Sequence, residues 1–336
     1  MDTIRKKPVN VYRGPYIEST HDVHVAVVND KQELLYFYGD PERLTFARSS
    51  MKPFQAVPLV ETGAAEHFFF NPKDLALACA SHSGEAFHRS GVYSILDRID
   101  LPENALQCGS HVPRDQEGYE KHIREGGKLT PVFSNCSGKH SGMLTTAVHM
   151  KEDPDSYREV EHPVQQRILE DIAEICDYPK AEIAISVDGC GVPVHQLPLK
   201  KTAFGYARLA HPEGEHAEAL AKIRDAMMAH PEMVGGTNRF DTDVMKAFNG
   251  NLVAKGGAEG VQCIGVVDRG LGIIVKVEDG NGRATSAVSM EVLKQLGIGD
   301  EAIYKQLEQH RIPPVKNVRE DTIGKIEADF QLEKAQ

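Results

Sequence analysis

Two motifs far apart in the chain carry side chains that could hydrolyse an amide. The segment Ser49–Lys52 has the pattern Ser-x-x-Lys at the expected start of a helix, where positions i and i+3 share one face. A desolvated lysine can lose its proton and act as a base toward a serine hydroxyl. The second motif, Lys255-Gly-Gly, opens a strand-rich region, and small residues there let a substrate approach the strand backbone. Together the two motifs indicate a serine amidohydrolase.

Each motif also has an ordinary structural interpretation. Ser49 could be the N-cap of a helix that carries Lys52 on its surface. The glycines after Lys255 could form a turn or a bulge instead of a catalytic strand. The functional interpretation therefore depends on the order and context of both motifs.

Two polar loops each contribute one cysteine. The loop at residues 134–142 contains Cys136, and the loop at residues 188–193 contains Cys190. Two thiolates could hold Zn²⁺, with Lys139, a histidine or water completing the site. The alternative is a pair of unrelated buried thiols.

Two further loops carry hydroxyl and guanidinium groups. Residues 80–85 include Ser81, which could present its hydroxyl into a cleft. Residues 235–241 include Arg239, which could clamp a carboxylate or pair with Asp241 at the surface.

Alternating and helical hydrophobic patterns predict the elements that must position these residues. Residues 21–28 and 34–38 predict a β-hairpin just before Ser49, and residues 260–268 and 272–278 predict two more strands. Helices are expected at 54–61, 87–99, 163–176, 215–230 and 284–296.

This order predicts an α/β (α+β) fold in which strands from both ends of the chain share one antiparallel sheet with flanking helices. The sheet lobe is expected at about residues 1–45 and 250–336, and a mainly helical lobe at about 46–249 is inserted into it. The whole chain would be a single two-lobed domain, and active clefts often form at such lobe boundaries.

The composition excludes several functional classes. The 336 residues carry a net charge of −11, which argues against binding nucleic acid. No apolar run follows the basic residues Arg5–Lys7, so no secretory signal is expected, and no stretch is long enough to span a membrane. Six cysteines without an export signal predict reduced thiols in a cytoplasmic protein.

Taken together, the motifs resemble the Rhizobium etli-type (class 3) L-asparaginases over nearly the whole chain. The resemblance rests on six segments in the same order: 48–53, 80–85, 135–140, 188–193, 239–243 and 255–260. That family is similar in fold to serine β-lactamases and glutaminases. The Lys-Thr-Gly element of β-lactamases stands here as Lys-Gly-Gly, and their Ser-Asp-Asn element has no plain counterpart, so turnover of β-lactams is not expected.

The resemblance implies hydrolysis of L-asparagine to L-aspartate and ammonia by a homodimer. It implies two Ser–Lys pairs, Ser49 with Lys52 and Ser81 with Lys255. It also implies a zinc site formed by Cys136, Lys139 and Cys190, with the lysine bound as its neutral amine.

We expect Ser49 to be the nucleophile and Ser81 with Lys255 to pass protons, with Ser81 as the alternative nucleophile. Four residues are expected to bind the substrate: Arg48, His140, Asp188 and Arg239. Zinc would position the substrate and fix two loops. Three alternatives remain: an amidase that uses zinc-bound hydroxide, a serine enzyme acting on glutamine or another amide, and a non-catalytic amino-acid-binding or penicillin-binding-like module.

Overall fold

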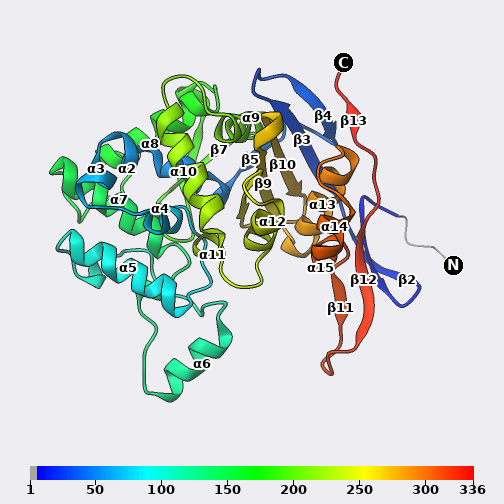
Figure 1. Ribbon diagram of the computed structural model, residues 1–336, viewed down its shortest axis with the longest axis horizontal. Helices are drawn as coiled ribbons and strands as arrows, with labels where there is room; N and C mark the ends of the chain where they lie inside the picture. Colours follow the sequence, from blue (N-terminus) through cyan, green and yellow to red (C-terminus); the bar gives the residue numbers. More distant parts are fainter. Residues whose placement is uncertain (1–5) are drawn as a thin grey trace.

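The computed structural model describes residues 6–336. Of the basic residues Arg5–Lys7, Arg5 lies outside the described residues. A six-stranded antiparallel sheet lies at the centre of one lobe (Figure 1). Its strands, in spatial order, are β13 (Glu333–Lys334), β4 (Leu34–Tyr38), β3 (Val23–Asn29), β10 (Leu271–Val277), β9 (Val261–Val266) and β8 (Leu252–Gly257). The prediction that strands from both chain ends share one antiparallel sheet is therefore confirmed.

The predicted hairpin is the N-terminal contribution to this sheet. β3 pairs with β4 on one side and with β10 on the other. Val25 and Val27 are buried as the alternation predicted, but Ala26 and Val28 on the opposite face are buried too. Other elements therefore cover both faces of β3, which packs on helix α9 (Leu199–Ala210).

Helix α9 approaches the sheet very closely at one point. A Cβ atom on Gly272 of β10 would lie 1.7 Å from the carbonyl oxygen of Ala203. Only glycine fits at this contact, so the helix and the strand pack backbone to backbone. Helix α13 (Thr285–Gln295) packs on β9, β10 and β12, between the central sheet and a second sheet (Figure 1).

Two smaller antiparallel sheets complete the strand structure. A four-stranded sheet has the order β11 (Pro314–Lys316), β12 (Thr322–Ala328), β1 (Val9–Arg13) and β2 (Tyr16–His21). A three-stranded sheet has the order β5 (Leu44–Phe46), β7 (Pro193–Pro198) and β6 (Ala184–Val187). The strands β11–β13 in the tail were not predicted, because their residues are mostly half-exposed and show little alternation.

The other helices lie mainly in the segment between β5 and β8, which forms the left part of Figure 1. They are α1 (Lys52–Gln55), α2 (Val57–Glu61), α3 (Ala64–His67), α4 (Pro72–Ala78), α5 (Ala86–Arg98), α6 (Gln116–Arg124), α7 (Ser137–Met150), α8 (Pro163–Ile175), α10 (Ala217–Ala229), α11 (Pro231–Val234) and α12 (Phe240–Phe248). The chain after α13 adds α14 (Glu301–Gln306) and α15 (Glu308–Arg311). None of the helices in residues 6–336 has the length and apolar character that crossing a membrane requires.

The loop predicted at residues 134–142 is wrong from Ser137 onward, because α7 begins there. The small polar residues serve packing inside a buried helix. A Cβ atom on Gly138 would lie 2.2 Å from the carbonyl oxygen of Leu77 in α4, so this glycine permits a close helix–helix contact. The buried hydroxyls of Ser141 and Thr145 donate to carbonyl oxygens one turn earlier, which satisfies them without a loop.

Candidate active site

A polar cleft of about 400 Å³ collects several of the predicted residues. Its walls come from the 3-10 turn η1 (Arg48–Met51), the segment after α4, the end of β8 and the starts of α12 and α13. The lining residues are Ser49, Ser81, Arg114, Asn135, Asn238, Arg239, Phe240, Asp241, Lys255, Gly256, Gly257, Ala258, Val261, Gln262, Gly282, Thr285, Ser286 and His310. The cleft thus joins residues of the segment between β5 and β8 with residues of β8 and of the chain after it.

The hydroxyl of Ser81 lies between two lysines. Lys52 Nζ and Lys255 Nζ each lie 2.9 Å from Ser81 Oγ. Both lysine side chains are fully buried, and Lys52 also donates to the carbonyl oxygen of Ala80. Burial and fixed partners hold both nitrogens against one hydroxyl, an arrangement suited to moving protons.

Lys255 can be neutral at physiological pH. Complete burial lowers the pKa of Lys255 to about 7; Asp241 opposes this change and the nearby Lys52 favours it. The Asp241 carboxylate lies 3.8 Å from Lys255 Nζ and accepts hydrogen bonds from the Gly256 N–H and the Gln262 amide. These contacts fix the strand that carries Lys255, whose neutral amine can accept a proton.

Ser49 lines the same cleft and is half-buried. The sequence suggested that Ser49 and Lys52 could touch, but the hydrogen bonds of the described residues connect Lys52 with Ser81 instead. The preceding residue, Arg48, has φ +52°, a left-handed conformation that is uncommon for a residue other than glycine. Such strained backbone clusters at functional sites, and here it aims the turn that carries Ser49.

Two arginines, Arg114 and Arg239, line the cleft. Arg239 is the N-cap residue of α12, and its Nε atom is buried without a hydrogen-bond partner among residues 6–336. Burial lowers the pKa of Arg114, and the nearby Arg239 lowers it further. Two close, partly desolvated guanidinium groups create a need for a negative charge, which the carboxylate of a small substrate would supply.

The other residues expected to bind substrate lie outside the lining of this cleft. The Arg48 Nε atom donates to Asp188 Oδ1 at 2.7 Å, and Arg48 lines a neighbouring cavity instead. His140 is fully buried, with Nδ1 2.6 Å from the Tyr157 hydroxyl. Of the four, Arg239 alone is positioned to meet a substrate directly in the cleft.

The three predicted zinc ligands, Cys136, Lys139 and Cys190, lie close together, and Lys52 connects them with Ser81. Lys139 Nζ lies 3.0 Å from Cys190 Sγ, and Lys52 Nζ lies 3.2 Å from Cys136 Sγ. A hydrogen bond from Cys190 holds the pKa of Cys136 well below its usual range, although burial opposes this shift. Burial would lower the pKa of Lys139, but the charges at Cys190 and Cys136 raise it.

This donor set fits a zinc ion. Two thiol sulfurs and one amine converge from α7 and from the turn before β7, and Asp188 stands beside them, with its Oδ2 3.9 Å from Cys190 Sγ. Sulfur and nitrogen are the ligand atoms that Zn²⁺ prefers. None of the six cysteines forms a disulfide, so both thiols are available as ligands.

The sequence model of the family described as L-asparaginase II matches residues 9–328. The chain belongs to this family. The predicted recognition is therefore confirmed at the level of the family. No curated protein matches the sequence.

Three solved structures are similar to this L-asparaginase II family chain at low sequence identity. Mglu in its native form is 14% identical with a TM-score of 0.47, and covers 82% of this chain, which spans only 64% of Mglu. A β-lactamase (Mb2281c) from Mycobacterium bovis is 12% identical, with a TM-score of 0.46 and coverage of 81% and 94% of the two chains. An octameric penicillin-binding protein homologue from Pyrococcus abyssi is 13% identical, with a TM-score of 0.44 and coverage of 84% and 74%. The family assignment stands on the sequence match alone.

Sequence reasoning missed Arg114, gave no role to Asn135, and offered Asp241 only as a possible surface partner of Arg239. Arg114 lies in the connection between α5 and α6, where no motif marks it. A single arginine in a long connection carries no sequence signal. Asp241, in contrast, lies in segment 239–243, which carried part of the family resemblance, and it could have been assigned as the partner of Lys255.

Proposed function

We propose that the protein is an L-asparaginase that hydrolyses L-asparagine to L-aspartate and ammonia by Ser–Lys chemistry. The observation that carries this proposal is the hydroxyl of Ser81 held between Lys52 and Lys255, both at 2.9 Å, at the wall of a cleft that contains two arginines. Membership of the L-asparaginase II family supports the same substrate.

Substrate binding follows from the charges of the cleft. Arg114 and Arg239 hold the α-carboxylate of L-asparagine, because both line the cleft and the Nε atom of Arg239 is buried without a hydrogen-bond partner among residues 6–336. Asn135 and Asn238 add amide groups to the same wall. The side-chain amide of the substrate then points toward the two serines.

Ser49 attacks the amide carbon. Its hydroxyl faces the cleft from the strained turn after Arg48, and it is not tied to two lysines as Ser81 is. Lys52 follows Ser49 by three residues on the same turn, so its amine can reach the Ser49 proton when substrate closes the site; such contacts often tighten only in the complex. Backbone N–H groups of η1 and of the end of β8 are candidates to stabilise the oxyanion.

Ser81 and Lys255 handle the remaining proton transfers. Ser81 donates its proton to the leaving nitrogen and regains one from a lysine ammonium, so that ammonia departs and the aspartyl ester of Ser49 remains. The neutral amine of Lys255 then takes a proton from water, whose oxygen attacks the ester. The bond to Ser49 breaks, the Ser49 oxygen regains a proton that passes from the Lys255 ammonium through Ser81 and Lys52, and L-aspartate is released.

Cys136, Lys139 and Cys190 would hold Zn²⁺ in this proposal. A bound zinc ion supplies a fixed positive charge that can orient one end of the substrate. Lys52 contacts Cys136 as well as Ser81, so the charge of the thiol cluster also acts on the lysine that binds the Ser81 hydroxyl. The ion pair between Asp188 and Arg48 stabilises the turn that carries Cys190.

A second assignment of the nucleophile has its own support. Ser81 contacts Lys255 directly, and Lys255 has the lowered pKa that a general base needs. In that case Ser81 attacks and Ser49 binds the substrate.

Ammonia release from L-asparagine and L-glutamine by wild type, Ser49→Ala and Ser81→Ala tests the function. We expect faster turnover of L-asparagine and a large loss in both variants. Faster turnover of L-glutamine would overturn the substrate assignment, and unchanged activity in both variants would overturn the Ser–Lys mechanism.

A further inference from the structure

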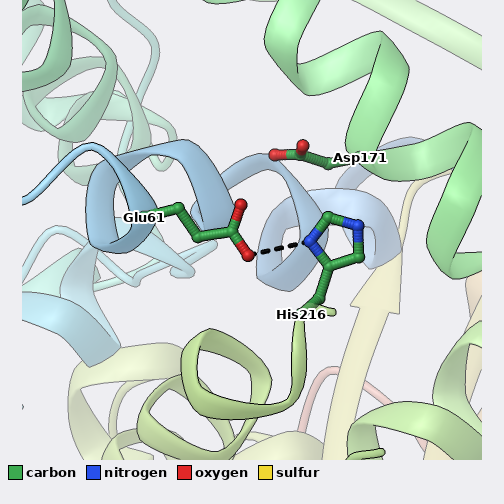
Figure 2. Close-up of side chains that lie close together, drawn as sticks. All are labelled: Glu61, Asp171 and His216. Carbon is green, nitrogen blue, oxygen red and sulfur yellow. Dashed lines mark hydrogen bonds and ion pairs between the residues drawn. The ribbon is translucent and has the colours of Figure 1, made fainter. Parts of the chain in front are cut away.

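A second group of possible metal ligands lies in the helical segment, on different elements from the cleft. Glu61 ends α2, Asp171 lies in α8, and His216 immediately precedes α10. One ligand atom from each of the three residues lies within 4.8 Å of the others. Figure 2 shows the two carboxylates and the imidazole arranged around one space, with Glu61 directed at the ring.

The hydrogen bonds leave one buried oxygen of this group without a partner. His216 Nδ1 lies 2.8 Å from Glu61 Oε1, and His216 Nε2 lies 3.0 Å from Glu174 Oε2. Asp171 is only 8% exposed, and its Oδ2 atom has no hydrogen-bond partner among residues 6–336. A buried, unpaired carboxylate oxygen is costly and calls for a partner.

The local charges are negative. The charged groups acting most strongly on Asp171 are His216 and three acids, Glu61, Glu174 and Glu170. One imidazole cannot neutralise so many carboxylates, even when it is protonated. A cation in the space between Glu61, Asp171 and His216 would neutralise them and occupy the free oxygen.

We propose that Glu61, Asp171 and His216 form a binding site for a first-row divalent cation such as Zn²⁺. One imidazole nitrogen with two carboxylate oxygens is a ligand set that suits zinc, and solvent completes the coordination. With Nδ1 on the metal, the Nε2–H group donates to Glu174, the outer contact that commonly orients a metal-binding histidine.

The site would join three helices of the helical segment. Its cation would link the end of α2, the middle of α8 and the start of α10. Since α2 follows α1, which begins with Lys52, the cation would also brace the segment that carries this lysine. Glu61 and Glu174 are the more exposed members and give the ion a route from solvent.

Zinc binding to the double variant Cys136→Ser/Cys190→Ser separates this site from the thiol cluster. We expect titration calorimetry to show one Zn²⁺ per chain and a rise in melting temperature with zinc. Adding Asp171→Asn should abolish both, and Glu174→Gln should weaken binding about 10- to 100-fold, as loss of an outer contact does. Glu170→Gln is the matched control, because Glu170 is the neighbouring acid of α8 but pairs with Lys180; it removes the same charge without a contact to His216, so its zinc binding should fall much less than that of Glu174→Gln.

Absence of zinc binding in the double variant, or binding that Asp171→Asn leaves intact, would overturn the proposal. If the double variant does not fold, metal analysis of the otherwise unmodified chain replaces it. Asp171→Asn should then hold one Zn²⁺ fewer than wild type, and equal zinc content would overturn the proposal. With chelator present, Asp171→Asn should melt no lower than wild type, because Asp171 Oδ2 has no hydrogen-bond partner to lose among residues 6–336; a large drop would mean that Asp171 serves the fold and not a metal.

Discussion

The side-chain nitrogen of Lys255 lies 2.9 Å from the hydroxyl oxygen of Ser81. Lys255 stands on β8 at the C-terminal side of the chain, and Ser81 follows α4 in the helical segment. This contact therefore joins the edge strand of the central sheet to the helical segment at the cleft. The side-chain nitrogen of Lys52 also lies 2.9 Å from the Ser81 hydroxyl oxygen.

Replacing Ser81 with alanine should remove proton transfer between the two lysines. General acid–base groups contribute about 10²- to 10⁴-fold to rate, so we expect a loss of kcat of that order and a KM close to wild type. Steady-state ammonia release measures both. Ser83→Ala is the matched control, since the Ser83 hydroxyl donates to the Gly235 carbonyl and contacts no lysine. Equal losses in the two variants would point to a structural effect.

Activity should rise with pH through about 7, the pKa to which burial lowers Lys255. The neutral amine accepts the proton, so the active form accumulates above that pKa and is lost as pH falls below it. The pH profile of kcat/KM measures this limb. Lys255→Arg should be inactive at every pH, because arginine stays charged. A profile flat through neutral pH would exclude Lys255 as the base.

Local patterns predicted the strands of the N-terminal hairpin, because alternation and turn residues are visible in the local sequence. Alternating valines marked β3, and a turn and a second apolar run marked β4, close to their observed bounds. The same reasoning failed for α7, where Gly138 and Ser141 suggested a loop. Gly138 permits the close contact with α4, and Ser141 bonds to the carbonyl oxygen of Ser137 within α7. Sequence spacing does not reveal the helix contact.

For the candidate site, too, the sequence identified the residues but not all of their contacts. The motifs identified Ser49, Ser81 and Lys255, which line one cleft. They also identified Lys52, but spacing paired it with Ser49, whereas it contacts Ser81. Lysine has a long side chain, and its nitrogen here reaches Ser81 and Cys136 across the core. Contacts between distant segments depend on packing, so the shared lysine could not be predicted from the spacing of residues.

Removing either arginine of the cleft should weaken binding of the substrate carboxylate. Hydrogen bonds to charged groups contribute about 1.5–3 kcal/mol, so Arg239→Gln or Arg114→Gln should raise KM roughly 10- to 100-fold. An amide without an α-carboxylate should be hydrolysed equally by wild type and variants. Arg124→Gln, which changes an exposed arginine of α6, is the control. If both substrates lose equally, these arginines do not bind the carboxylate.

Removing zinc from the Cys136, Lys139 and Cys190 cluster should weaken turnover without abolishing it. Ser–Lys chemistry needs no metal, so a chelator or Cys190→Ser should mainly raise KM. Ammonia release and metal content measured on the same samples test this expectation. Complete loss of turnover on chelation, with full recovery on adding Zn²⁺, would instead indicate attack by zinc-bound hydroxide.

The central claim is that Ser49 forms a covalent ester with the substrate. Peptide mass mapping after rapid acid quench of wild type with L-asparagine tests it most directly, with Ser49→Ala and Ser81→Ala as comparisons. We expect an aspartyl adduct on the peptide that contains Ser49, none in Ser49→Ala, and slower formation in Ser81→Ala. An adduct on Ser81, or turnover in the absence of any adduct, would contradict the account.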